Sequence, residues 1–213
     1  MKAVEYLTNT DVSLTVCFTL DDERTRSVVE WGQSHFPITA ITLEPSHLFR
    51  RAIGRHIAAN STKADMVWFT YVDYLFTRDS LVTSYNKYVG SIAPLIFPKV
   101  VWTSHTHKEG DKYTEEQFGQ DEPLEIDEDL FYAREMKKAI GGIQIVNGKW
   151  CREHGYLDGT KWVQPVESNH FVSCKCDVPF RKGMDSVRHD IAGVYRVRHS
   201  KAGRDKGTKD HGK

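Results

Sequence analysis

Asp73 stands at a point of the chain where a ligand site is expected. It directly follows residues 64–72 (ADMVWFTYV), an almost uninterrupted run of aromatic and β-branched residues. This run predicts a central parallel strand that is buried on both faces. Parallel α/β sheets bind their ligands beyond the carboxyl ends of the strands. The Asp73 carboxylate is therefore a candidate ligand-binding group, with a plain turn residue as the alternative.

Two histidines form a second candidate site. His105 and His107 are two positions apart in a segment with strand character, and such side chains point to the same side of a strand. The pair could bind a metal ion, which would suggest a metal-dependent hydrolase, but third and fourth ligands with convincing spacing are missing. Cys174 and Cys176 also lack the second pair that a zinc site needs, so we expect reduced thiols.

The N-terminal residues predict the start of an α/β fold. Residues 12–19 (VSLTVCFT) have strand composition, residues 24–35 read as a helix, and residues 38–43 (ITAITL) form a second strand. This β-α-β order favours a parallel sheet.

The next helix is expected from Ser46 to about Asn60, because its apolar residues recur at helical spacing. Arg51 and Arg55 are four positions apart and share a face that is turned away from this apolar stripe. A solvated basic face is the simplest interpretation of this pair.

In the second half of the chain we expect helices and strands to continue to alternate. Asp79-Ser80 begins a helix through Tyr88, residues 95–103 have strand character, and residues 130–139 read as a short helix. Asn147-Gly148 predicts a turn between two strands.

The composition describes a globular protein without a charge surplus. The 213 residues are 39% hydrophobic, and 29 basic residues balance 29 acidic ones. Non-specific nucleic-acid binding is therefore not expected as the main activity, since it needs an excess of positive charge. We expect no contact with a membrane, because no apolar run reaches the roughly 18–20 residues of a membrane span. With no signal-peptide pattern either, a cytoplasmic location is expected.

The domain organisation follows from the same features. A single domain is expected over residues 1–200, followed by a flexible basic tail at 201–213. Residues 114–129 contain eight acidic residues and no basic one, which predicts a mobile loop.

The order of these features resembles that of the GT-A class of nucleotide-sugar glycosyltransferases. A β-α-β opening, a basic helix, a strand that ends in aspartate, a Gly-Gly segment and Arg198-His199-Ser200 follow one another. The resemblance is greatest to the galactosyltransferase and N-acetylgalactosaminyltransferase-like branch. It implies a GT-A-like (Rossmann-like) α/β fold with a mostly parallel central sheet flanked by helices. It also implies an inverting transfer of a sugar from a nucleotide-diphosphate sugar to an acceptor hydroxyl.

The resemblance implies a metal site. In this family the strand ends in Asp-x-Asp; here Tyr71 replaces the first aspartate, which helps to hold the nucleotide-sugar, and Asp73 keeps the second. Asp73 would bind Mn²⁺ (or Mg²⁺), and His199 would complete the site. Such an ion bridges the two phosphates and neutralises charge on the departing nucleoside diphosphate.

The resemblance also assigns two pairs of residues to the donor. Arg51 and Arg55 would face the diphosphate, for which forked guanidinium donors are well suited. Gly141 and Gly142 would pass beneath the donor sugar, because glycine lets the backbone approach a ligand closely. A tight turn that opens a hairpin is the alternative for the two glycines.

The family's catalytic base would be Asp177, with Glu167 as the second candidate. A plain ion pair with Arg181 is the alternative for Asp177. The acceptor is a saccharide by default, while a protein, a small molecule or a hydroxymethylated base in DNA are alternatives. Two other functions stay open. Because Tyr71 replaces an acid, the fold could serve as a non-catalytic nucleotide-sugar-binding module, and His105 and His107 could instead serve a metal-dependent hydrolase.

Overall fold

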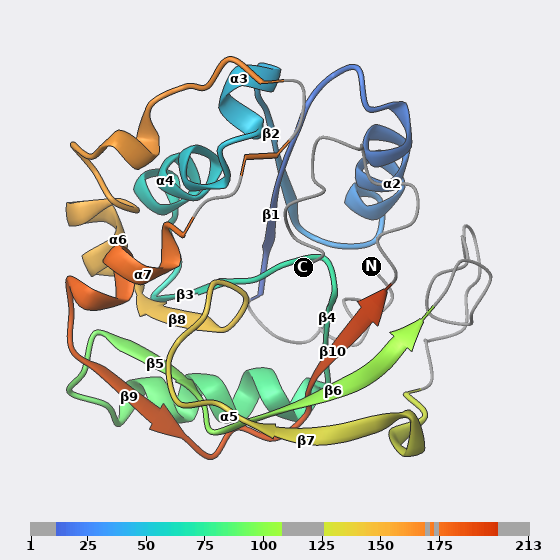
Figure 1. Ribbon diagram of the computed structural model, residues 1–213, viewed down its shortest axis with the longest axis vertical. Coiled ribbons are helices and arrows are strands. Elements are labelled where there is room, and N and C mark those ends of the chain that lie inside the picture. Colours follow the sequence, from blue (N-terminus) through green and yellow to red (C-terminus); the bar gives the residue numbers. More distant parts are fainter. Residues whose placement is uncertain (1–11, 108–125, 169–170, 173–174, 200–213) are drawn as a thin grey trace.

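The N-terminal part is a β-α-β unit, as expected. The computed structural model describes residues 12–107, 126–168, 171–172 and 175–199. Strands β1 (Leu14–Phe18) and β2 (Ile38–Thr42) pair in parallel, and helix α2 (Glu23–Gln33) connects them. The carboxylate of Asp22 accepts a hydrogen bond from the Thr25 amide at 3.0 Å and so caps α2. In Figure 1 this unit lies at the top.

Two helices, rather than one, follow β2. Helix α3 (Pro45–Leu48) is short, and helix α4 (Arg51–Ser61) begins after a break at Phe49 and Arg50. Helix α4 approaches β1 closely through Gly54, where an added Cβ would lie 3.0 Å from the Cys17 sulfur. The helix expected from Ser46 to about Asn60 therefore lies within one residue of the observed helical limits at both ends, but it is wrong as a single helix because of the break.

Two four-stranded sheets form the rest of the structure. The strands of the first have the order β3-β8-β5-β9, and those of the second have the order β4-β10-β6-β7. The first sheet contains β3 (Met66–Phe69), β8 (Gln144–Asn147), β5 (Leu95–Pro98) and β9 (Ser186–His189). The second contains β4 (Tyr74–Phe76), β10 (Val194–His199), β6 (Val100–His107) and β7 (Phe131–Glu135).

The chain crosses between these two sheets five times. One crossing, from β4 to β5, runs through residues 77–94, and we call the other four, which are short, the seam (Figure 1). Strand β3 leads to β4, β5 to β6, β7 to β8, and β9 to β10. The linking residues are 70–73, Lys99, 136–143 and 190–193. The seam therefore brings together loops from four distant parts of the sequence.

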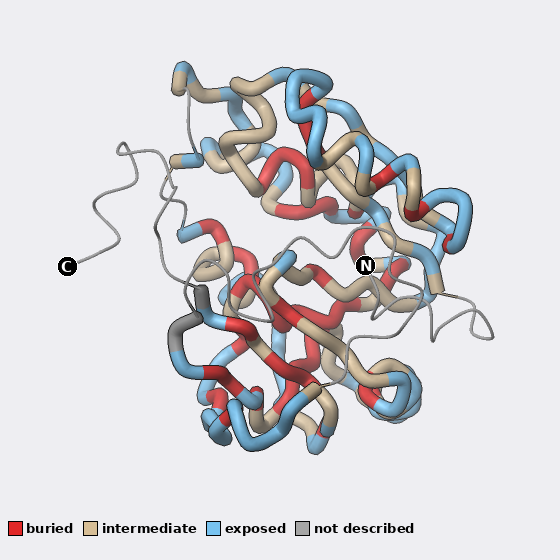
Figure 2. The backbone as a smooth tube through the Cα atoms, turned by 90° about the vertical axis from the view of Figure 1, so that its right-hand side faces the viewer, coloured by how far each residue is buried: buried red, intermediate tan, exposed pale blue. Residues whose placement is uncertain are grey.

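The hydrophobic core lies where the first sheet meets helices α4, α6 (Gly148–His154) and α7 (Asp177–Lys182). Ile145 and Tyr156 are completely buried there, and the Tyr156 and Phe180 rings stack with centroids 4.0 Å apart. Figure 2 shows that buried residues lie mainly on inner parts of the backbone trace, whereas many of its outer turns are exposed. Helix α5 (Arg78–Val89) also packs on this sheet, where Asn147 donates to the Tyr88 hydroxyl at 2.7 Å. Two short 3₁₀ segments complete the elements: η1 (Glu128–Leu130) and η2 (Lys161–Val163).

The fold class is mixed α/β, but the sheets are small and combine parallel with antiparallel pairs. Among the described residues, the expected mostly parallel central sheet is not found. Strand β3, expected to be central and parallel, is an edge strand that pairs antiparallel with β8. Its apolar run is explained by covering side chains: Trp68 packs against Phe76, and Phe69 against Tyr156.

Two local predictions in the second half are wrong. Residues 131–135, expected in a helix, form strand β7 at the edge of the second sheet. Asn147-Gly148 is not a hairpin turn; Asn147 caps helix α6 by accepting from the Trp150 amide at 3.0 Å. The tail at 201–213 and most of the acidic run lie outside the described residues. In the part of the chain that is described, no helix has the length and apolarity to cross a membrane.

Candidate functional site

The candidate site lies at the seam, where the loops at 70–73 and 136–143 meet helix α4. Tyr71 lies at its centre, with its ring against Gly141 and Gly142. A methyl group on Gly141 would overlap with the Tyr71 hydroxyl, and one on Gly142 would overlap with the Tyr74 ring. Both positions therefore need glycine because two tyrosine rings approach the backbone, not because of an unusual backbone angle.

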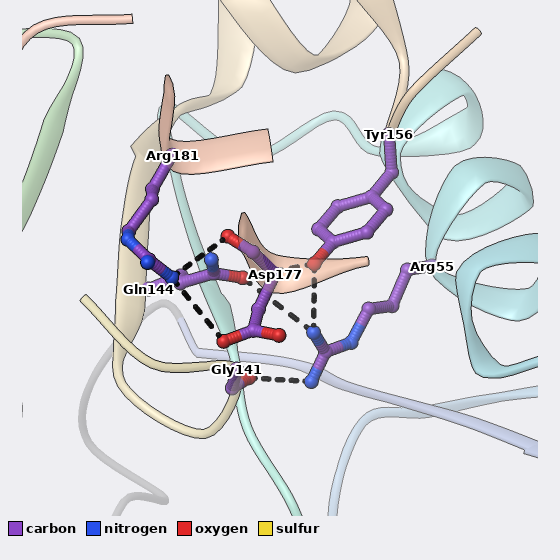
Figure 3. A network of polar contacts seen from close by, with 6 residues as sticks. All are labelled: Arg55, Gly141, Gln144, Tyr156, Asp177 and Arg181. Atoms are coloured by element: carbon purple, nitrogen blue, oxygen red, sulfur yellow. Dashed lines mark hydrogen bonds and ion pairs between the residues drawn. The ribbon is translucent and has the colours of Figure 1, made fainter. Parts of the chain in front are cut away.

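The side chain of Arg55 extends from helix α4 into this loop cluster (Figure 3). Its guanidinium donates to the carbonyl of Gly141, to the Tyr156 hydroxyl at 3.0 Å and to Oε1 of Gln144 at 3.5 Å. Its Cζ atom lies 4.9 Å from the centre of the Tyr71 ring. Within the described residues no carboxylate forms an ion pair with Arg55, so no described acid balances its positive charge.

Tyr156 and Gln144 hold the guanidinium group of Arg55 through hydrogen bonds. The buried Tyr156 hydroxyl donates to Gln144 Oε1 at 3.1 Å while it accepts from Arg55. Burial raises the pKa of Tyr156, so the phenol keeps its proton and can fill both roles. Gln144 is also buried, and its Nε2 has no hydrogen-bond partner among the described residues.

Arg51 stands one helical turn before Arg55 and contacts the same ring. Its Cζ lies 5.3 Å from the centre of Tyr71 and 6.0 Å from that of Phe171. Tyr71 is thus contacted by two guanidinium groups. The arginines of α4 face the loop cluster, and the simpler interpretation of a solvated basic face does not describe Arg55.

Asp73 lies beside this cluster, at the start of β4. One carboxylate oxygen, Oδ2, accepts from Nε of Arg196 at 3.0 Å. The other, Oδ1, is buried and has no hydrogen-bond partner among the described residues. The Asp73 carbonyl accepts from the Val197 amide at 2.8 Å, which fixes the loop against β10.

These residues fit a divalent cation in part. The orphaned Oδ1 of Asp73 is the kind of oxygen that Mn²⁺ or Mg²⁺ binds. Backbone pairing places His199 opposite His107 at the ends of β10 and β6, but neither side chain belongs to the described part. The described residues contain no group of three potential metal ligands, and the phenol of Tyr71 offers no carboxylate.

The two candidates for the catalytic base lie in different surroundings. Asp177 begins helix α7, and its carboxylate accepts from Arg181 at 3.5 Å. In the view of Figure 3 it lies between Arg181 and the pair of Arg55 with Gly141. Glu167 is exposed, in a segment whose Val166 amide donates to the Ser46 carbonyl at 2.9 Å. The structure thus draws Asp177, rather than Glu167, toward the loop cluster.

Of the second candidate site, the histidine pair His105 and His107, the structure describes only one side chain. His105 is exposed and its ring lies 5.5 Å from that of Tyr132. The His107 side chain is outside the described residues.

Sequence reasoning missed two residues of the site. They are Gln144, which accepts from Arg55, and Arg196, which donates to Asp73. Strand alternation shows which face Arg196 occupies but not that its partner, Asp73, lies 123 positions away.

Comparison of the chain with protein-family models, with curated proteins and with solved structures gave no match.

Proposed function

We propose that this chain is a GT-A-like glycosyltransferase that transfers a sugar from a nucleotide-diphosphate sugar to an acceptor hydroxyl. One observation carries the proposal: Arg55, which has no carboxylate partner among the described residues, brings its positive charge to the Gly141 carbonyl and the Tyr71 ring, two positions before Asp73. These groups come from separate segments, and the residues that the resemblance assigns to the donor thus meet at one place.

The donor would be held by charge and by close backbone approach. Arg51 and Arg55 would donate to the diphosphate oxygens, because a guanidinium offers several donors in a fixed plane. The backbone at Gly141 and Gly142 would lie against the sugar. Asp73, with His199, would hold Mn²⁺ or Mg²⁺, which when bound would neutralise charge on the leaving diphosphate.

Asp177 would act as the general base. Its carboxylate would accept the proton of the acceptor hydroxyl, while the hydroxyl oxygen forms a bond to the anomeric carbon. The bond from that carbon to the diphosphate oxygen breaks on the opposite face, and its electron pair leaves with the nucleoside diphosphate. Such a displacement inverts the anomeric centre. Arg181 would orient the Asp177 carboxylate.

The acceptor in this proposal is a saccharide, with a small molecule, a protein or a hydroxymethylated DNA base as alternatives. Assays of product with each acceptor class distinguish them.

A thermal-shift screen of nucleoside diphosphates and their sugars, with and without manganese, tests the donor. Binding stabilises the folded protein by an amount that grows with ligand concentration. We expect one nucleotide family to raise the melting temperature by several degrees. A screen in which no nucleotide raises it contradicts the proposal.

A non-catalytic nucleotide-sugar-binding module is the second candidate, because the Tyr71 hydroxyl lies against Gly141, where the donor sugar would pass. Binding of a sugar-nucleotide without hydrolysis or transfer would favour it.

A further inference from the structure

Arg196 is a guanidinium at the seam to which the proposed function gives no role. Its Nε donates to Asp73 at 3.0 Å, and its side chain is 30% exposed. Within the described residues, its two terminal nitrogens donate no hydrogen bond to the protein. One edge of the guanidinium is therefore fixed, and the other is available to a ligand.

Backbone pairing holds β10 on both sides at Arg196. The pairing of β10 with β6 shifts register between Arg196 and Arg198, and Ser104 Oγ accepts from the Arg198 amide at 2.9 Å within that irregularity. The extra residue of this shift lies on β6, which is the strand that such an irregularity bends. On the other side of β10, the Val197 amide donates to Asp73. Arg196 and Asp73 are thus held together by backbone as well as by their side chains.

Arg55 and Arg196 each contact one of the two neighbouring tyrosines of the site. The Cζ of Arg55 lies 4.9 Å from the centre of Tyr71, and that of Arg196 lies 5.7 Å from the centre of Tyr74. The two ring centres are 6.5 Å apart. Asp73 neutralises Arg196 in part, whereas Arg55 has no described counter-ion, so the site carries a net positive charge without any added ion.

We propose that Arg196 binds the diphosphate directly through its two terminal nitrogens, while its Nε holds Asp73 in place. Fixed guanidinium groups then supply positive charge that would otherwise require a divalent cation, and the site binds a diphosphate without metal. This inference rests on the proposed function, because it concerns the same donor site. It also explains how the site can act with Tyr71 in place of a carboxylate.

Titration calorimetry of the full chain with inorganic pyrophosphate, first in EDTA and then in manganese, tests the inference. We expect the unmodified protein to bind pyrophosphate in EDTA. Arg196→Gln should weaken this metal-free binding by at least about tenfold, since it removes hydrogen bonds between charged groups. Arg198→Gln, which removes an exposed arginine two positions along the same strand, is the control and should change it by less than about threefold.

Arg196→Gln leaves the buried Asp73 carboxylate without its partner and could unfold the protein. The double variant Arg196→Gln/Asp73→Asn removes both charges, and thermal melting shows whether it is folded. The folded double variant should also lack metal-free binding.

The outcomes separate the inference from the proposed function. Binding that occurs only with manganese, or equally in Arg196→Gln and the unmodified chain, overturns the inference and leaves the donor site in place. Absence of pyrophosphate binding in both buffers overturns the donor site as well.

Discussion

Tyr156 joins the hydrophobic core to the charged site. Its ring stacks on Phe180, while its hydroxyl accepts from Arg55 and donates to Gln144. One side chain thus packs in the core and orients the guanidinium that would bind the diphosphate. Its hydroxyl is expected to contribute to both stability and binding.

Tyr156→Phe removes the hydroxyl and keeps the ring. We expect the free energy of unfolding to fall by about 1–3 kcal/mol, because Arg55 and Gln144 each lose a buried partner. Pyrophosphate affinity should fall severalfold as Arg55 loses its orientation. Urea denaturation and calorimetry measure the two effects, with Tyr132→Phe as the exposed control.

Two variants, each with an amide in place of the carboxylate, distinguish Asp177 from Glu167 as the general base. Asp177→Asn keeps size but removes the proton acceptor, so turnover should fall by about 10²-fold or more. Donor affinity should stay nearly unchanged, since in the proposed function Asp73 and the arginines, not Asp177, would form the donor site. Glu167→Gln should retain turnover. The assignment fails if Glu167→Gln loses turnover and Asp177→Asn does not.

At the scale of elements, the loops of the seam depend on how the neighbouring helices begin and end. Helix α6 follows β8 directly because Asn147 caps it, and the same side chain donates to Tyr88 on helix α5. One amide therefore connects a strand and two helices behind the Gly141–Gly142 loop.

Asn147→Ala removes both hydrogen bonds. The free energy of unfolding should fall by roughly 1–2 kcal/mol, as is usual when a helix cap is lost. Asn86→Ala, in the exposed face of α5, should change it by less than about 0.5 kcal/mol. Chemical denaturation of both variants measures the difference. Equal losses of unfolding free energy in the two variants would contradict the role of Asn147 in connecting these elements.

Sequence patterns predicted those elements that carry a strong local signal. The β-α-β opening, the end of α4 and the strands on either side of Lys99 follow from composition and periodicity. Asn147-Gly148 was misread because asparagine favours both tight turns and helix caps, and local sequence does not separate them. The edge strand β7 is mostly exposed and lacks the alternation that identifies a strand.

The sequence predicted only those residues of the site that belong to a local pattern or match a motif of the resembled family. Arg55, Tyr71 and the two glycines were chosen from motifs, and the structure brings them together. The ion pair of Asp73 with Arg196 joins residues 123 positions apart, so no local pattern could indicate it. Only the pairing of β10 with β4 and β6 creates this contact.

At the scale of the whole molecule, the burial of tyrosines makes stability depend on alkaline pH. Burial raises the pKa of the Tyr74 phenol to about 12, whereas an unfolded chain releases this proton near pH 10. The stabilisation is complete below about pH 10 and is lost as the pH rises toward 12, because the unfolded state ionises first.

Tyr74→Phe should therefore lose less stability between pH 10 and 12 than the unmodified protein. The difference between their slopes should approach about 1.4 kcal/mol per pH unit. Urea denaturation at several pH values measures it, with Tyr85→Phe as an exposed control. Identical pH dependence in Tyr74→Phe and the unmodified chain would contradict this.

The four crossings of the seam have a consequence for how the protein folds. Neither four-stranded sheet consists of a continuous stretch of chain, and β10 pairs with strands from much earlier in the sequence. Such non-local pairing gives a high contact order, which slows folding to milliseconds or longer. Both sheets should also unfold in one cooperative step, with coincident transitions by tryptophan fluorescence and circular dichroism. A denaturant concentration that separates Asp73 from Arg196 would then unfold both sheets at once, without a partly open intermediate.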